Sequence, residues 1–151
     1  MKEATGKGCD GQPLLPGVEA LLRDARALGL GRAVASSSSC GWVEGWLRRH
    51  GIRDLLDVVV ARDDVRNVKP DPELFLLAAS RLGVDPGACL VLEDSPNGMR
   101  AALAAGMRCV AVTNALTRSL ARPDVDLVLG SLAERPLAAI LETLAAAAVR
   151  A

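Results

Sequence analysis

Aromatic residues are nearly absent from this sequence, which has no tyrosine, one phenylalanine and two tryptophans among 151 residues. A core cannot rest on large rings and must be built from Leu, Val, Ala and Ile, and the 50% hydrophobic content allows this. With 24% charged residues, the composition is that of a folded globular chain and not of a disordered one. The length suits one domain with its own core.

An excess of charge of either sign is also missing, because 18 Lys and Arg residues balance 18 Asp and Glu residues. A neutral chain gives no electrostatic reason to bind nucleic acid or an anionic membrane surface. A small anionic substrate is still compatible, since its binding depends on local charge alone. We therefore expect no nucleic-acid partner.

Long apolar runs and cysteine motifs are absent as well. No apolar stretch reaches the roughly 18 to 20 residues that span a bilayer, and the opening MKEATGKGCDG lacks the apolar segment of a signal peptide. No membrane association is expected. The cysteines form neither a CxxC pair nor a metal-finger spacing, and two of them lie in apolar runs where a reduced thiol acts as a small hydrophobe. This favours a reducing cytoplasm over a disulfide-bearing compartment; the cysteines are Cys9, Cys40, Cys89 and Cys109.

What is present is a regular alternation of amphipathic and short apolar segments. Continuous apolar strands separated by amphipathic helices predict an α/β fold with a parallel sheet covered on both faces. We expect helices over 16–31, 40–51, 69–83, 97–107 and from residue 136 onward, and strands over 32–35, 55–61, 88–93, 108–113 and 126–130.

Single residues refine this pattern. Asp71 is the expected N-cap of the third helix, with Pro72 as its first helical residue. Trp42 and Trp46 lie one turn apart and are interpreted as packing anchors and not as a ligand cage. His50 follows the second helix and is interpreted as a C-terminal cap.

Polar side chains follow the predicted strands at the point where ligands bind in parallel sheets. Ser36 comes directly after the first strand, within VASSS, and Glu93 and Asp94 end the third strand, within VLEDSPNG. Lys69 precedes a proline in the loop between the second strand and the third helix. We expect these groups to meet at one edge of the sheet.

Their chemistry suits phosphoryl transfer. A serine hydroxyl and the amides at a helix start bind anions, a lysine neutralises an oxyanion, and paired carboxylates are hard ligands for Mg²⁺ beside a phosphate. Each element alone also has a simpler interpretation: a serine-rich turn, a solvated lysine, or an acidic turn. The order of the elements along the chain favours the joint interpretation. A phosphorelay receiver is excluded by that order, because receivers place the acids first and the lysine last.

Here the sequence resembles the haloacid dehalogenase superfamily, in the branch of sugar-phosphate phosphatases and β-phosphoglucomutases. VASSS is similar to the second family motif, KPDPELF to the third, and LEDSPNG followed by AALAAGM to the fourth. PLLPGVEALL resembles the segment that re-enters the core domain after a cap. The resemblance covers residues 13 to about 145 and implies a Rossmann-like parallel sheet sandwiched by helices.

The resemblance also implies residue roles. Ser36 would hydrogen-bond the transferring phosphoryl group, with Ser37 and, after it, Ser38 as further phosphate contacts. Lys69 would neutralise the phosphoryl group and contact the nucleophile, and Asp94 with Glu93 would hold Mg²⁺. Asn97 and Gly98 are expected only to shape the turn and start the next helix.

The family nucleophile, an Asp in a DxDGT-like motif after an N-terminal strand, is not found. Asp10 in GCDGQP has no apolar strand before it and no second acid at the matching position, so a plain turn is favoured. We therefore expect residues 1–13 to be a linker or cap remnant and residues 14–151 to be a partial core domain without a cap. The central strand, between those ending at Ser36 and Glu93, would be missing.

Two function classes follow from this. The first is a Mg²⁺-dependent phosphatase or phosphomutase acting on a small phosphorylated metabolite such as a sugar phosphate, with the present chain inactive without its nucleophile. The second is a non-catalytic relative that binds phosphate or a protein partner. We expect a monomer or weak dimer, with another chain supplying the missing strand as a further alternative.

Overall fold

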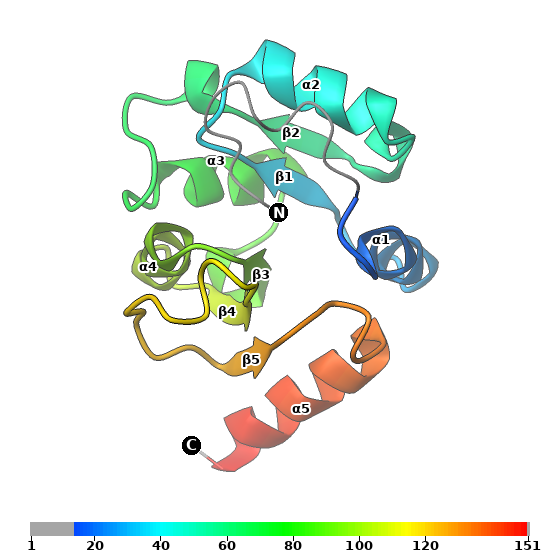
Figure 1. Ribbon diagram of the computed structural model, residues 1–151, viewed down its shortest axis with the longest axis vertical. Coiled ribbons are helices and arrows are strands. Elements are labelled where there is room, and N and C mark those ends of the chain that lie inside the picture. The colour runs from blue at the N-terminus through cyan, green and yellow to red at the C-terminus, as the bar shows by residue number, and fades with distance from the viewer. Residues whose placement is uncertain (1–13, 151) are drawn as a thin grey trace.

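Residues 14–150 are described by the structure, a computed structural model in which four of the five strands are each followed by an α-helix (Figure 1). The predicted α/β class is confirmed. The strands are β1 (Ala33–Ala35), β2 (Val58–Val60), β3 (Leu90–Glu93), β4 (Arg108–Val112) and β5 (Leu127–Leu129). The α-helices are α1 (Val18–Ala27), α2 (Cys40–Arg49), α3 (Glu73–Leu82), α4 (Pro96–Ala104) and α5 (Leu137–Arg150). Short 3₁₀ turns lie at Arg53–Leu55, Arg62–Asp64 and Pro86–Ala88.

The helices begin where local sequence satisfies their first amides. Ser39 caps α2 by accepting the Trp42 N–H, and Ser95 caps α4 by accepting the Gly98 N–H. The prediction for α3 was wrong by one residue, because Pro72 occupies the N-cap position. The Asp71 carboxylate still accepts the Glu73 N–H at 2.9 Å, so it does the capping from one residue further out.

The strands of the described residues form two sheets. β1 pairs with β2, and β4 lies between β3 and β5, all in parallel register. The two sheets form separate groups in Figure 1. Within residues 14–150, β1 and β3 do not pair with each other, and this break falls where the sequence analysis expects the central strand. The N-terminal assignment and Asp10 lie outside the described residues.

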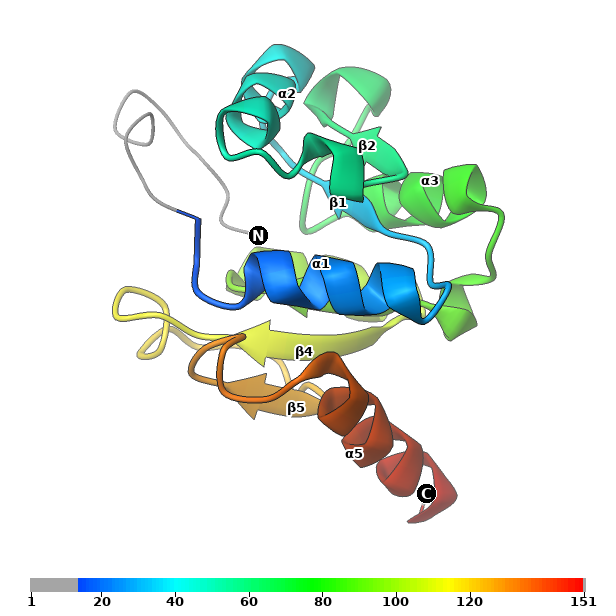
Figure 2. The ribbon, with the colours of Figure 1, turned by 90° about the vertical axis from the view of Figure 1, so that its right-hand side faces the viewer.

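Two helices join the sheets. On α1, Leu22 packs with the apolar cluster beside β1 and β2, whereas its neighbour Leu21 packs against the cluster beneath β5 and α5. On α3, Leu74 packs against β2, whereas Phe75 belongs to the cluster around β3, β4 and α4. In Figure 2, α1 crosses between the two groups of strands. Side-chain packing therefore holds the two sheets together.

Glycine at position 17 anchors the start of α1. Its φ is +88°, and a Cβ there would lie 2.5 Å from the backbone nitrogen of Ala133. Both the backbone conformation and the close approach of the segment before α5 therefore require the absence of a side chain.

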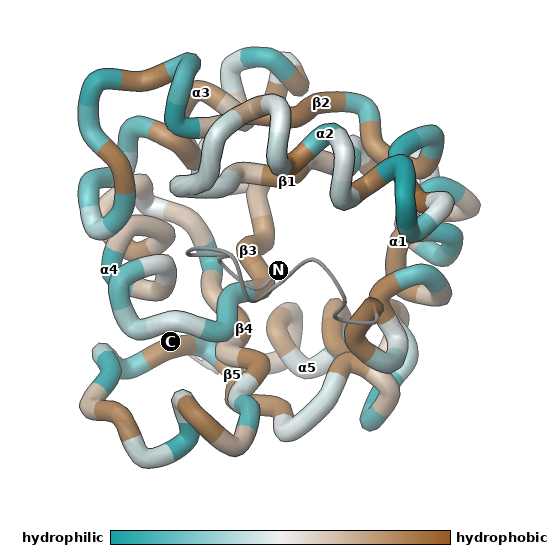
Figure 3. Tube along the Cα trace, turned by 45° about the horizontal axis from the view of Figure 1, so that its top comes forward, coloured by the Kyte–Doolittle hydropathy of each residue, from teal (hydrophilic) through white to brown (hydrophobic). Residues whose placement is uncertain are grey.

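The core follows the hydropathy of the chain. In Figure 3 the strands are coloured mainly as hydrophobic, whereas hydrophobic and hydrophilic segments alternate along the helices and the outer loops. Trp42 and Trp46 stack on each other with ring centroids 6.3 Å apart and pack against the β1–β2 cluster, as anchors of α2. His50 is the C-cap of α2, and its ring stacks on Trp46. In the described part of the chain, no helix is both long and apolar enough to cross a membrane.

Candidate active site

The buried polar side chains of the described residues are almost the same set as the predicted site. They are Ser36, Ser38, Lys69, Glu93 and Asp94, each 9% exposed or less. Polar groups are costly to bury without partners, so their concentration at strand ends marks a specialised region. All of the predicted site residues except Ser37 are therefore buried in the structure. They lie at the carboxyl ends of β1 and β3 and in the loop after β2.

The serine loop begins directly at the end of β1. The Ser36 N–H continues the ladder to Val60 in β2 at 2.9 Å, and the Ser36 hydroxyl accepts the Ser38 N–H at 3.1 Å. The Ser38 carbonyl in turn accepts the Arg62 N–H at 3.0 Å. Of the two serines that follow Ser36, Ser38 is buried, whereas Ser37 is only partly buried.

Lys69 and Glu93 form a buried ion pair. The Lys69 Nζ donates to Glu93 Oε2 at 2.9 Å, and both side chains are 2% exposed. The ammonium also lies 4.9 Å from the centre of the Phe75 ring, within cation–π range. Burial acts to raise the pKa of Glu93, but the opposing effects, of which the Lys69 charge is the largest, hold the pKa below the ordinary value. Glu93 is therefore ionised and fixed against the lysine.

The second oxygen of Glu93 organises the loop that follows β3. Glu93 Oε1 accepts the Asp94 N–H at 3.2 Å, the Ser95 N–H at 3.3 Å and the Ser95 hydroxyl at 3.2 Å. Ser95 is also the residue that caps α4, so one hydroxyl serves the helix and the carboxylate. Three donors on one oxygen fix the position of this carboxylate.

Asp94 differs from Glu93 in having an unused oxygen. Its Oδ1 is buried and has no hydrogen-bond partner among the described residues. Burial, reinforced by the neighbouring Glu93 charge, raises the pKa of Asp94 to about 6. A cation placed at Oδ1 would satisfy this oxygen and favour its ionised form.

These residues fit Mg²⁺. The described residues contain no group of three or more His, Cys, Asp or Glu side chains arranged to hold a metal. Mg²⁺ does not need such a group, because it is usually held by one or two carboxylates, waters and a substrate phosphate. Asp94 Oδ1 is the atom best suited to it, with the Glu93 carboxylate adjacent in the chain.

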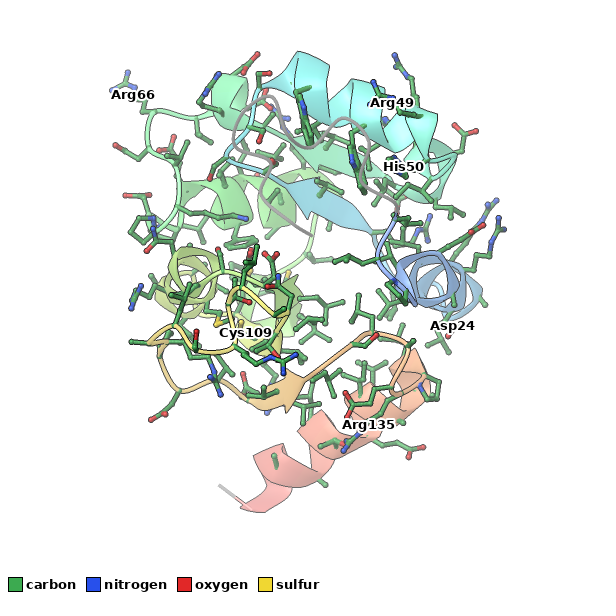
Figure 4. All side chains as sticks on the ribbon, viewed as in Figure 1. Asp24, Arg49, His50, Arg66, Cys109 and Arg135 are labelled. Carbon is green, nitrogen blue, oxygen red and sulfur yellow. The ribbon has the colours of Figure 1, made fainter. Side chains whose placement is uncertain are left out.

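A further carboxylate, which the sequence analysis did not single out, shapes the loop that carries Lys69. Glu73, the first residue of α3, accepts the Arg66 N–H at 3.0 Å, the Asn67 N–H at 2.9 Å and the Asn67 side-chain amide at 3.2 Å. In Figure 4, Arg66 extends outward from this loop. The only sequence signal was a Glu in the first turn of a predicted helix, a common feature with several explanations.

Cys109 lies within the β3–β5 half, near the strand that ends in Glu93 (Figure 4). Burial raises the pKa of its thiol to about 12. A thiol that stays protonated at neutral pH is an inert packing group and not a nucleophile. The interpretation of this cysteine as a small buried hydrophobe is consistent with that environment.

Comparison with family models decides the classification. Residues 3–106 match the model described as haloacid dehalogenase-like hydrolase, and residues 67–146 match a second hydrolase model of the same type. The chain belongs to the haloacid dehalogenase-like hydrolase family. The predicted resemblance is thereby confirmed.

Individual relatives in this family agree. The chain is 48% identical over 143 residues to YhcW of Bacillus subtilis (strain 168), which carries the name of a phosphatase, across 95% of this chain and 65% of that protein. The crystal structure of CbbY from Rhodobacter sphaeroides in complex with phosphate superposes with a TM-score of 0.78 at 38% identity, covering 83% of this chain and 58% of that one. A β-phosphoglucomutase from Clostridium difficile gives a TM-score of 0.78 at 30% identity, covering 90% and 58% of the respective chains.

The chain thus spans less than two thirds of the length of these haloacid dehalogenase-like relatives. The two solved structures share its fold over 83% and 90% of this chain. Their activities concern longer chains.

Proposed function

We propose that this chain carries most of the active site of a Mg²⁺-dependent phosphatase or phosphomutase that acts on a small phosphorylated metabolite such as a sugar phosphate. The observation that carries the proposal is the burial of Ser36, Glu93 and Asp94 at the ends of β1 and β3, and of Lys69 in the loop after β2, with Asp94 Oδ1 unsatisfied. The names of the relatives, a phosphatase and a phosphoglucomutase, support the substrate class.

Each residue has a distinct proposed role. Ser36, whose own amide is bonded to Val60, contacts the oxygens of the phosphoryl group through its hydroxyl, and Ser37 contacts them through its hydroxyl and amide. Lys69 neutralises charge on the same group as it transfers. Asp94, with Glu93, holds Mg²⁺, which when bound supplies charge neutralisation and orientation at the phosphate. Positioning and electrostatics account for most of the catalysis of such a transfer.

The nucleophile is proposed to come from a segment outside residues 14–150. β1 and β3 are not paired with each other within those residues, which leaves a place for one more parallel strand between them. An Asp at the end of such a strand would reach the edge where Ser36 and Glu93 lie. The greater length of the relatives supports this proposal.

Activity assays test the proposal. The 151-residue chain is expected to show no Mg²⁺-dependent hydrolysis of p-nitrophenyl phosphate. A version extended by an in-frame upstream strand with a DxDGT motif is expected to hydrolyse it, with a loss of about 100-fold or more in kcat for Lys69→Met or Asp94→Asn.

Two outcomes would contradict it. Robust turnover by the 151-residue chain, abolished by Ser36→Ala, would show that the nucleophile lies within the present sequence. An extended chain that binds phosphate without hydrolysing any phosphate ester would favour the non-catalytic alternative.

A further inference from the structure

Gly98 is the third residue of α4, and its lack of a side chain has a reason that the sequence does not show. Its φ is not positive, so the backbone conformation does not require glycine. A Cβ at this position would overlap Cγ, Cδ and Oε2 of Glu93. The carboxyl group of Glu93 therefore occupies the space that any other residue at position 98 would fill.

Ser95 holds the same carboxyl group from the other side of the turn. Its hydroxyl accepts the Gly98 N–H at 3.0 Å and donates to Glu93 Oε1 at 3.2 Å. The start of α4 is thereby connected through one oxygen atom to Glu93. Glu93 Oε2 in turn receives the Lys69 Nζ at 2.9 Å.

We propose that Ser95 and Gly98 are positioning residues, which seat Glu93 against the start of α4 and thereby set the position of the Lys69 ammonium. Both act through Glu93, and neither has a proposed contact with the phosphoryl group. Their importance for phosphate binding rests on the proposed function, in which Lys69 faces the phosphoryl group. The effect of Ser95 and Gly98 on the Lys69–Glu93 contact does not depend on the proposed function.

Helix propensity alone predicts that Gly98→Ala stabilises α4, whereas the contact with Glu93 predicts that it disturbs the site. Replacing a helical glycine by alanine normally stabilises a helix, because it reduces the backbone entropy of the unfolded chain. Gly98→Ala is instead expected to displace the Glu93 side chain. Gly45→Ala is the matched control, since Gly45 lies inside α2 without a positive φ and a Cβ there would meet nothing within 4 Å.

The direct measurement is NMR of lysine ammonium groups. The sequence has three lysines, Lys2, Lys7 and Lys69, so ¹⁵N-lysine labelling gives a simple spectrum in which loss of a signal in Lys69→Arg assigns Lys69. A buried ammonium hydrogen-bonded to a carboxylate exchanges slowly with water. The Lys69 signal is expected in the parent chain and in Gly45→Ala, and is expected to shift or disappear in Gly98→Ala.

Serine variants test the second positioning residue without a steric clash. Ser95→Ala is expected to shift the Lys69 signal, and Ser95→Thr, which keeps a hydroxyl, is expected to restore it. Ser39→Ala is the control, because Ser39 caps α2 in the same way and has no contact with Glu93 among the hydrogen bonds of the described residues. Ser39→Ala is therefore expected to remove a helix cap and leave the Lys69 signal unchanged.

Calorimetric titration with inorganic phosphate in the presence of Mg²⁺ connects this geometry to binding. Gly98→Ala is expected to weaken phosphate binding by about tenfold or more, as for the loss of one charge-assisted hydrogen bond, with Gly45→Ala unaffected. An unchanged Lys69 signal in both Gly98→Ala and Ser95→Ala would overturn the inference. The Lys69 signal could shift in the variants while the parent chain binds no phosphate. That result would support the positioning roles of Ser95 and Gly98 but would count against the proposed function.

Discussion

The buried Lys69–Glu93 pair is the residue-scale feature with the largest energetic consequence. Removing two charges from water is expensive, and the 2.9 Å contact and the donors around Glu93 offset part of this cost. Removing one partner would leave the other charge buried and unpaired. The stability of this region therefore depends on the pair being intact and not on either residue alone.

A double-mutant cycle measures this dependence. Lys69→Met or Glu93→Leu alone is expected to lower the free energy of unfolding by about 3 to 5 kcal/mol. The double variant is expected to lose less than the sum, because no unpaired charge remains. Urea unfolding followed by circular dichroism provides the measurement, and strictly additive losses would show that the two side chains are not energetically coupled.

Among the secondary-structure elements, α3 fixes the loop that precedes it through the side chain of its first residue, Glu73. Glu73 receives two backbone amides and one side-chain amide from Arg66 and Asn67. These donors lower the pKa of Glu73 below its ordinary value of 4.5. The position of Lys69 is thus linked to a carboxylate four residues further along the chain.

This contact gives Glu73 a pH-dependent stabilising role. Because its pKa is lower in the folded state, the contribution is present above about pH 4.5 and is lost as the pH falls through the lowered pKa. Glu73→Gln is expected to be less stable than the parent chain at pH 7, and the difference is expected to shrink as the solution is made more acidic.

Denaturant unfolding at a series of pH values tests this expectation. Glu142→Gln, at an exposed position on α5, is the matched control and is expected to change little. A Glu73→Gln deficit that stays constant from pH 7 into the acid range would show that the carboxylate charge is not responsible.

The elements were largely predictable from the sequence because their signals are local. Apolar runs such as those ending at Ser36 and Glu93 predicted strands, and the family motifs placed the polar residues at strand ends. The N-cap of α3 was off by one residue because Asp71 can cap through its side chain while Pro72 holds the N-cap backbone position. A sequence pattern does not distinguish these two arrangements.

The contacts that support the site were not predictable from the sequence. Gly98 suggested a turn residue, whereas its function is steric and depends on where the Glu93 carboxyl lies. The three donors on Glu93 Oε1 and the loop amides on Glu73 likewise depend on side-chain placement in three dimensions. Periodicity and motif spacing contain no information of this kind.

At the scale of the whole molecule, packing across the helices joins two separate sheets. α3 contributes Leu74 to the cluster beside β2 and Phe75 to the cluster beside β3 and β4. Phe75 also lies beside the Lys69 ammonium. The integrity of the site therefore depends on contacts between the halves as well as on contacts within each.

Phe75→Ala tests this dependence. The loss of a buried ring 7% exposed is expected to cost about 3 to 5 kcal/mol of unfolding free energy. Leu76→Ala, one position along α3 at a side chain 41% exposed, is expected to cost far less. Equal losses in the two variants would show that the contacts of Phe75 between the halves add nothing to stability beyond those of an exposed side chain.

The stacked tryptophans of α2 have an optical consequence. With no tyrosine in the chain, Trp42 and Trp46 provide essentially all of its absorption and emission at long ultraviolet wavelengths. Both indoles pack beside β1 and β2, so fluorescence reports on that half, while β3, β4 and β5 contain no such chromophore. Intrinsic fluorescence therefore reports on the β1–β2 side of the protein. Local unfolding around α5 would not change this fluorescence unless a further fluorophore were introduced there.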